Sequence, residues 1–217
     1  RIDSFMLRAG KSDFLLDGSA KNLLPVLFAD SLNTTGALLE FSAKLRSENF
    51  DVDQIIGMFS EQSTVTEAGG EAGLDSLKKE KNMERSLAMN KLKGTFEANI
   101  RGFKYGKIEG RNFGGSFEFD HNNLNFNGNA AAMQGELALE GNARFDLAAS
   151  LKMHIIARNL DLQTMLAQCE NFGQEVITEE NMRGRLSGRV VLWTFWNDFG
   201  EFDMKRLRAL ADVHATN

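Results

Sequence analysis

The chain has 217 residues, with 30 Asp and Glu against 25 Lys and Arg and a formal net charge of −5. The basic residues are scattered among acidic ones, which argues against nucleic acid as a partner, because binding a phosphate backbone requires a concentrated basic face. The single cysteine, Cys169, excludes an internal disulfide framework and a thiolate metal cluster, but leaves the compartment open. No apolar run approaches the length of a transmembrane helix.

The aromatic residues are strongly biased, with 17 Phe against 1 Tyr and 2 Trp. Phe contributes apolar area without a polar group, so this bias favours a core or an apolar surface over a polar active site. The chain also has 20 Gly but only one proline, Pro25. Its turns must therefore be made mainly by Gly, Asn and Asp.

The first third of the chain predicts strands and one short helix. Residues 2–9 and 13–20 fit two short strands around a turn at Gly10-Lys11-Ser12. Residues 37–47 alternate between apolar and polar side chains, as a strand with one buried face does. A short helix is expected over roughly 51–59.

The segment 41–56 is repeated in pattern at 151–166. In both, a strand-like stretch leads into Asn-apolar-Asp and then a short helical pattern, with Asp51 and Asp161 110 positions apart. Each Asp is a typical N-cap, because its carboxylate accepts from free N–H groups of the first helical turn. Apolar residues then follow at i, i+3, i+4 and i+7 in both copies: Val52, Ile55, Ile56 and Phe59, and Leu162, Met165, Leu166 and Cys169. This repeat predicts a modular β architecture, with Cys169 packed inside.

The middle of the chain separates two β units. Residues 60–73 are polar and Gly-rich, as in a loop, and 74–89 fit a weakly amphipathic helix. We therefore expect a first β unit with its short helix at 1–59, a linker or insertion, part helical, at 60–90, and a main antiparallel β unit with the second short helix at 91–217. The chain starts and stops within a pattern, so we expect it to be a piece of a longer protein.

From residue 94 to 157 the alternation is nearly continuous. Apparent turn signals at Gly114-Gly115, Asn122-Asn123 and Asn127-Gly128 divide it into short strands, which favours consecutive antiparallel hairpins. A second helix is expected at 161–170, a strand at 185–196 and a last strand near 208–215, after a turn at Asn197-Asp198.

The strand at 185–196 differs from the others because its segment 189–196 is apolar on both faces. A strand with one face in water should alternate, so we expect something to cover its second face. Burial beneath the short helices, an apolar groove, or contact with a membrane or another chain would each account for the pattern.

No catalytic constellation emerges. His121, His154 and His214 are far apart and lack the spacing of metal ligands. Glu118 and Asp120 share one face of a strand, but exposed strand carboxylates are common and nothing indicates a raised pKa. We expect no enzyme activity, no cofactor and no metal site.

Three stretches of the chain carry a resemblance to a known family. The first is the repeated unit, Arg158-Asn159-Leu160-Asp161-Leu162-Gln163-Thr164-Met165-Leu166. The second is Gly94-Thr95-Phe96-Glu97-Ala98-Asn99-Ile100, followed by Ile108 and Asn112-Phe113-Gly114-Gly115-Ser116-Phe117. The third is Leu124-Asn125-Phe126-Asn127 and Ala130-Ala131-Ala132-Met133-Gln134-Gly135-Glu136-Leu137-Ala138-Leu139-Glu140-Gly141, extended by 182–188.

In this order the stretches resemble the AsmA family, in its C-terminal region, and the related TamB-type proteins of the Gram-negative envelope. The likeness covers most of 36–56 and 94–217 and skips 57–93. It implies a mainly β fold, an elongated, curled antiparallel sheet shaped like a trough, with short helices after the repeated strands. It also implies a periplasmic location, in a parent protein that an N-terminal helix anchors in the inner membrane.

The function implied by the resemblance is outer-membrane biogenesis, by binding or conveying phospholipid along the apolar groove. The expected groove lining is the set of apolar strand residues Phe96, Ile100, Phe113, Phe117, Phe119, Leu124, Phe126, Leu137, Leu139, Leu151, Met153, Ile155, Leu192, Trp193, Phe195 and Trp196. One alternative is an assembly factor that binds nascent outer-membrane proteins by strand addition at a sheet edge. A third hypothesis is an envelope hydrolase that uses Glu118 and Asp120.

Overall fold

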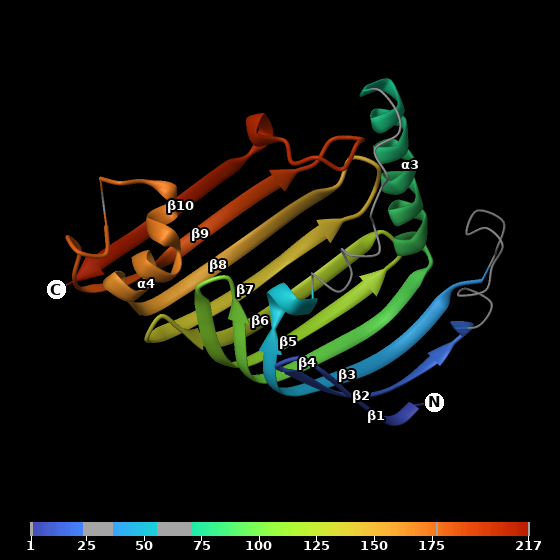
Figure 1. Cartoon of the computed structure of the whole chain (residues 1–217), viewed down its shortest axis with the longest axis horizontal. Helices are drawn as coiled ribbons and strands as arrows, with labels where there is room; N and C mark the ends of the chain where they lie inside the picture. Colours follow the sequence, from blue (N-terminus) through green and yellow to red (C-terminus); the bar gives the residue numbers. More distant parts are fainter. Residues whose placement is uncertain (1, 24–36, 56–70, 177, 217) are drawn as a thin grey trace.

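The computed structural model describes residues 2–23, 37–55, 71–176 and 178–216. They form ten strands in a single open sheet whose spatial order follows the chain (Figure 1). The strands are β1 (Ile2–Ala9), β2 (Ser12–Lys21), β3 (Leu39–Asp51), β4 (Leu92–Tyr105), β5 (Ile108–Asp120), β6 (Asn123–Ala132), β7 (Gly135–Arg144), β8 (Ser150–Asp161), β9 (Arg185–Phe195) and β10 (Arg208–Thr216). The expected fold class, a mainly β curled sheet, is confirmed, and β1 and β10 are its edges.

One pair of strands breaks the antiparallel order. β3 and β4 are parallel, with Leu39 opposite Leu92 and Leu45 opposite Ala98, while the other neighbours are antiparallel. A parallel pair needs a crossover that carries the chain back to the first end of the sheet. The helix α3 (Glu71–Asn90) lies in this crossover and confirms the helix predicted at 74–89. The strands assigned to residues 1–59 and 91–217 thus belong to one sheet.

The two faces of the sheet differ as the alternation predicts. Phe96 of β4 lies opposite Phe117 of β5, which in turn lies opposite Phe126 of β6. Between them, Glu97 and Glu118 point to the other side and are exposed. Because paired residues share a face, the apolar side chains of successive strands merge into one apolar face, and the charged and amide side chains into one polar face.

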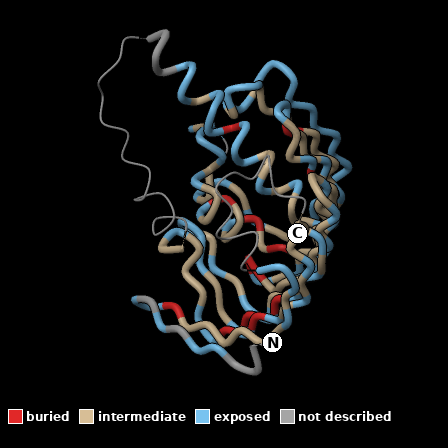
Figure 2. The backbone as a smooth tube through the Cα atoms, turned by 90° about the vertical axis from the view of Figure 1, so that its right-hand side faces the viewer, coloured by how far each residue is buried: buried red, intermediate tan, exposed pale blue. Residues whose placement is uncertain are grey.

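The sheet is curled towards its apolar face. The rings of Phe41 on β3 and Phe119 on β5 lie with centroids 5.6 Å apart, although β4 runs between their strands. Strands two apart are separated by about 9.5 Å at the backbone, so these side chains must lean together over Gly94 of β4. Figures 1 and 2 show the resulting bend, with β1 and β10 at opposite edges that do not meet.

Short helices follow both repeated strands, as expected. Residues 52–55 are helical, and the predicted continuation to 59 lies outside the described residues. The second helix, α4 (Leu162–Gln168), is followed by a single turn, η2 (Glu170–Gly173). The helical residues 52–55 and α4 with η2 lie at the same end of the sheet, beside the β4–β5 turn. There, Asp53 accepts a hydrogen bond from the Gly106 N–H, and Glu170 forms an ion pair with Lys107. α3 stands at the opposite end (Figure 1).

Two of the three turns predicted between residues 94 and 157 are wrong. Gly114-Gly115 lies inside β5 and Asn127-Gly128 inside β6, whereas Asn122 does lie in the turn between these strands. A Cβ on Gly115 would come within 2.7 Å of the Phe113 ring, and one on Gly128 within 3.1 Å. These glycines make room for an aromatic ring rather than for a turn.

None of the helices in the described part of the chain is both long and apolar enough to cross a membrane.

Candidate apolar groove

Most of the expected groove residues do share the apolar face. The register of β4 to β9 aligns thirteen of them in rows across six strands, for example Leu139 opposite Ile155 and Met153 opposite Leu192. They are Phe96, Ile100, Phe113, Phe117, Phe119, Leu124, Phe126, Leu137, Leu139, Leu151, Met153, Ile155 and Leu192. We refer to this inner surface of the sheet as the groove.

Trp193 and Phe195 are not part of the groove, contrary to expectation. They lie opposite Lys152 and Ser150 of β8, which are on the polar face. On this second face of the strand, cations lie against the Trp193 and Phe195 rings. The Lys152 ammonium lies 5.9 Å from the centre of the Trp193 ring, and the Arg206 guanidinium lies 4.1 Å from that of Phe195. Charged side chains thus cover part of these two rings through cation–π contacts, and none of the three expected covers lies over this face in the described residues.

Trp196 lies just beyond β9, where it forms an isolated bridge with Phe202. The two rings pack edge to face with centroids 5.7 Å apart. Trp196 therefore belongs to the end of the sheet near α3 rather than to the middle of the groove.

Phenyl rings lying over glycines shape the floor of the groove. A Cβ on Gly110 would fall 2.2 Å from the Phe103 ring, and one on Gly141 would fall 2.6 Å from the Phe126 ring. The same relation holds for Phe113 with Gly115 and Gly128. The rings can therefore lie along the sheet instead of standing upright, which keeps the groove shallow and smooth. Sequence analysis missed Phe103, because it is out of phase with the alternation of Phe96 and Ile100, although its ring lies 6.2 Å from that of Phe113.

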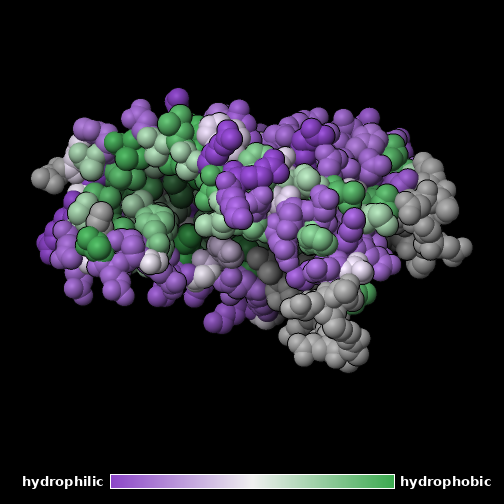
Figure 3. Space-filling view, turned by 90° about the horizontal axis from the view of Figure 1, so that it is seen from above, coloured by the Kyte–Doolittle hydropathy of each residue, from purple (hydrophilic) through white to green (hydrophobic). Residues whose placement is uncertain are grey.

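The groove is only partly covered. Of its thirteen side chains, Ile100 is buried and the other twelve retain intermediate exposure. The other buried hydrophobic residues of the central strands are mainly small or lie at the α4 end, such as Ala98, Ala132 and Ala143. A β-sandwich would cover this face with a second layer and bury the same residues fully. In Figure 3, hydrophobic side chains gather in a hollow that is bordered by hydrophilic ones.

α4 closes the groove at one end. Leu160, Met133 and Ala132 form a buried cluster against which Met165 and Cys169 pack. Burial raises the pKa of the Cys169 thiol, as expected for a packed rather than a reactive cysteine. The predicted packing of Cys169 is confirmed.

The other polar candidates lie outside the groove. A cavity of about 900 Å³ near α4 is lined by charges of both signs, among them Arg111, Glu136 and Arg158, all on the polar face. Glu118 and Asp120 are exposed on the same face, at the edge of the amide-rich rows of β5 to β7. Within the described ranges, no three His, Cys, Asp or Glu side chains come close enough to hold a metal ion.

The three histidines remain separate in the structure. His121 shares a 2.8 Å contact with the neighbouring Asp120, His154 lies 3.7 Å from Glu140, and His214 is exposed on β10. They do not converge on a common site.

No family model, no curated protein and no solved structure matches this chain.

Proposed function

We propose that the groove binds the acyl chains of phospholipid and that the protein conveys lipid along it without enzymatic chemistry. The observation that supports this proposal is the continuous apolar face of β4 to β9, over which the described residues form no second layer. An apolar surface that remains open in a folded protein is a typical site for an apolar ligand.

The energetics favour an acyl chain as ligand. Each methylene transferred from water to an apolar surface contributes about 0.8 kcal/mol, so a chain lying along the groove needs no specific polar contact. Because the glycine-backed rings leave a smooth floor, the ligand can slide instead of being held at one position. The polar face meanwhile keeps the outside of the sheet in water.

The cellular setting is part of the same proposal. The resemblance of the strand-Asn-apolar-Asp-helix unit to AsmA-like and TamB-type proteins supports a periplasmic segment of an inner-membrane-anchored protein that acts in outer-membrane biogenesis. The open sheet agrees with the trough that this resemblance implies.

A photo-crosslinking amino acid can test the lipid proposal. Placed at Phe117, in the groove, it should capture phospholipid from a native membrane extract. The matched control is Trp193, also a partly exposed aromatic strand residue, but on the polar face. Mass spectrometry should find lipid adducts at Phe117 and not at Trp193. Equal labelling at both positions, or none at Phe117, would refute lipid binding in the groove.

The alternative function, strand addition, is favoured by one observation. β10 is an edge strand and every one of its described residues is exposed. Its free backbone groups could pair with an extended segment of an outer-membrane protein. Such a peptide should protect the β10 amides from hydrogen exchange and leave the groove adducts unchanged. Protection confined to the groove residues would count against this alternative.

A further inference from the structure

Exposed apolar side chains gather at the α3 end of the sheet. The loop from β9 to β10 exposes Phe199 (38%), Phe202 (43%), Met204 (68%) and Leu207 (37%). Met204 belongs to a single helical turn, η3 (Met204–Arg206), which stands above β9 and β10 in Figure 1. All four side chains belong to one loop that lies outside the groove.

The same loop and the start of β10 present three cations within four positions. Lys205 and Arg206 follow Met204 directly, and Arg208, the first residue of β10, comes after Leu207. We call residues 199–208 the basic tip. Arg206 is held against Phe195, while the side chains of Lys205 and Arg208 form no ion pair within the described part of the chain.

Two of the three acidic residues in the loop from β9 to β10 are bound within the protein, and the third, Asp198, is exposed. Glu201 forms an ion pair with Lys78 of α3, with 2.6 Å between Oε1 and Nζ. Asp203 accepts a hydrogen bond from the Lys205 N–H and so caps η3. These two carboxylates are therefore engaged by the loop itself and by α3, while the charges of Lys205 and Arg208 remain for an external partner.

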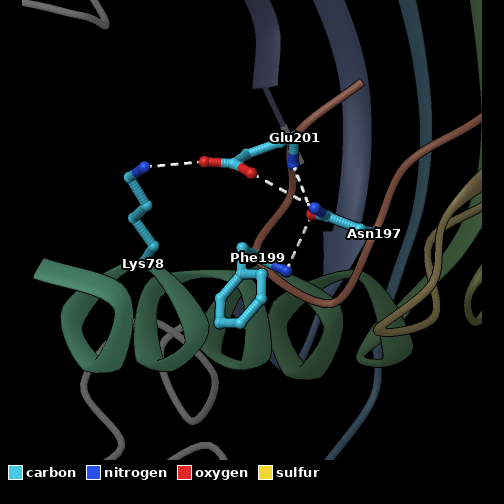
Figure 4. A network of polar contacts seen from close by, with 4 residues as sticks. All are labelled: Lys78, Asn197, Phe199 and Glu201. Carbon is cyan, nitrogen blue, oxygen red and sulfur yellow. Dashed lines mark hydrogen bonds and ion pairs between the residues drawn. The ribbon is translucent and has the colours of Figure 1, made fainter. Parts of the chain in front are cut away.

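The basic tip is built on a fixed base (Figure 4). The Asn197 side chain accepts hydrogen bonds from the N–H groups of Phe199 at 3.0 Å and Glu201 at 2.9 Å. Asn82 of α3 is buried and donates to the carbonyl oxygens of Leu147 and Asp198, both at 2.8 Å. The apolar side chains are therefore exposed on an ordered loop, and binding would cost little ordering entropy.

We infer that the basic tip docks on the surface of an anionic phospholipid bilayer. Apolar side chains next to Lys and Arg fit the bilayer–water interface, where the first enter the acyl boundary and the second meet anionic headgroups. This charge complementarity selects a bilayer over an apolar protein partner, which would leave the cations unpaired. The inference rests on the proposed function, because it names the end of the sheet that meets the membrane.

Vesicle binding tests the inference. The variant Met204→Ser/Lys205→Glu removes the most exposed apolar side chain of the tip and reverses one charge. The control Met6→Ser/Lys11→Glu makes the same changes at β1 and the β1–β2 turn, where Met6 is 67% exposed against 68% for Met204. Both proteins are sedimented with vesicles of phosphatidylcholine alone or with phosphatidylglycerol added.

The intact chain and the control should bind the anionic vesicles, and the tip variant should bind at least about tenfold more weakly. Raising the salt concentration should weaken binding of the intact chain, because it screens the headgroup attraction. Equal binding by the two variants, or equal binding to neutral and anionic vesicles, would overturn the inference.

The crosslinking at Phe117 separates this inference from the proposed function. Lipid adducts at Phe117 together with equal vesicle binding by both variants would refute the basic tip alone. Selective loss of vesicle binding without adducts would instead support the tip and refute lipid binding in the groove.

Discussion

The two copies of the strand–helix unit, 41–56 and 151–166, begin alike and continue differently. β3 and β8 both end in an Asp whose Oδ1 accepts from the backbone N–H three residues later, at 3.0 Å from Gln54 and 2.8 Å from Thr164. Both helices then lie beside the β4–β5 turn. The repeat therefore fixes where each strand ends and how its helix starts.

The repeat does not fix the orientation of the strand that follows it. After the second copy the chain stays at the same end of the sheet, through α4 and η2, and β9 then pairs antiparallel with β8. After the first copy the chain crosses to the other end through α3, and β4 pairs parallel with β3. The connection after the unit, rather than the unit itself, decides the orientation of the next strand.

Packing under the helices differs as well. Leu160, just before the second capping Asp, is 2% exposed and lies in the cluster with Met133. Phe50 has the same place in the first copy, but it is only half-buried and packs edge to face on Phe14 at 5.4 Å. The second copy is thus the better-packed end of the groove.

The largest expected effect breaks the parallel junction that only the first copy has. A Cβ on Gly94 would lie 1.9 Å from the carbonyl oxygen of Phe41, which is backbone and cannot move without disturbing the β3–β4 pair. We expect Gly94→Ala to destabilise the protein by about 4 kcal/mol or to prevent folding. Urea unfolding followed by circular dichroism measures the change.

Gly102→Ala on the same strand is the control. Its Cβ would meet its nearest neighbour, the Glu48 carbonyl oxygen, at an ordinary 3.4 Å. It should fold with nearly unchanged stability. Similar losses for the two variants would mean that β3 and β4 do not pack as described.

A smaller effect should reveal the unequal packing of the two copies. Leu160→Ala leaves a cavity in a closed cluster, for which we expect a loss of about 3 kcal/mol. Phe50→Ala removes a ring that solvent already reaches, so we expect about half of that loss. Thermal unfolding of both variants compares them. A greater loss for Phe50→Ala would show that the first helix covers its strand more tightly than α4 does.

Much of the fold could be predicted because alternation and the Asp caps are local signals. β1, β2, β9 and β10 lie close to their expected positions, whereas glycines inside β5 and β6 were mistaken for turns. The parallel β3–β4 pair could not be predicted, since it depends on the long crossover of 52–91. Trp193 was placed on the wrong face because an all-apolar strand carries no alternation, and its cover by Lys152 comes from another strand.

The smallest expected effect concerns the caps. The Asp161 carboxylate accepts from both the N–H and the hydroxyl of Thr164, at 2.8 and 2.6 Å, whereas Asp51 accepts one bond from Gln54. We expect Asp161→Ala to cost about 1 kcal/mol, and Asp51→Ala somewhat less. Asp161→Asn is the control, because its side-chain oxygen can still accept. Urea midpoints at pH 7 measure these differences.

The pH dependence isolates the charge of the same cap. The Thr164 hydroxyl, and then its N–H, hold the pKa of Asp161 below its usual value. The stability from this carboxylate is therefore complete above the pKa of an unfolded Asp, about 3.9, and is lost as the pH falls through the lower pKa of the folded state. Asp161→Asn should therefore lose less stability than the intact chain as the pH falls below about 3.9. Parallel pH profiles for the two proteins would assign the cap to hydrogen bonding alone, without a contribution from charge.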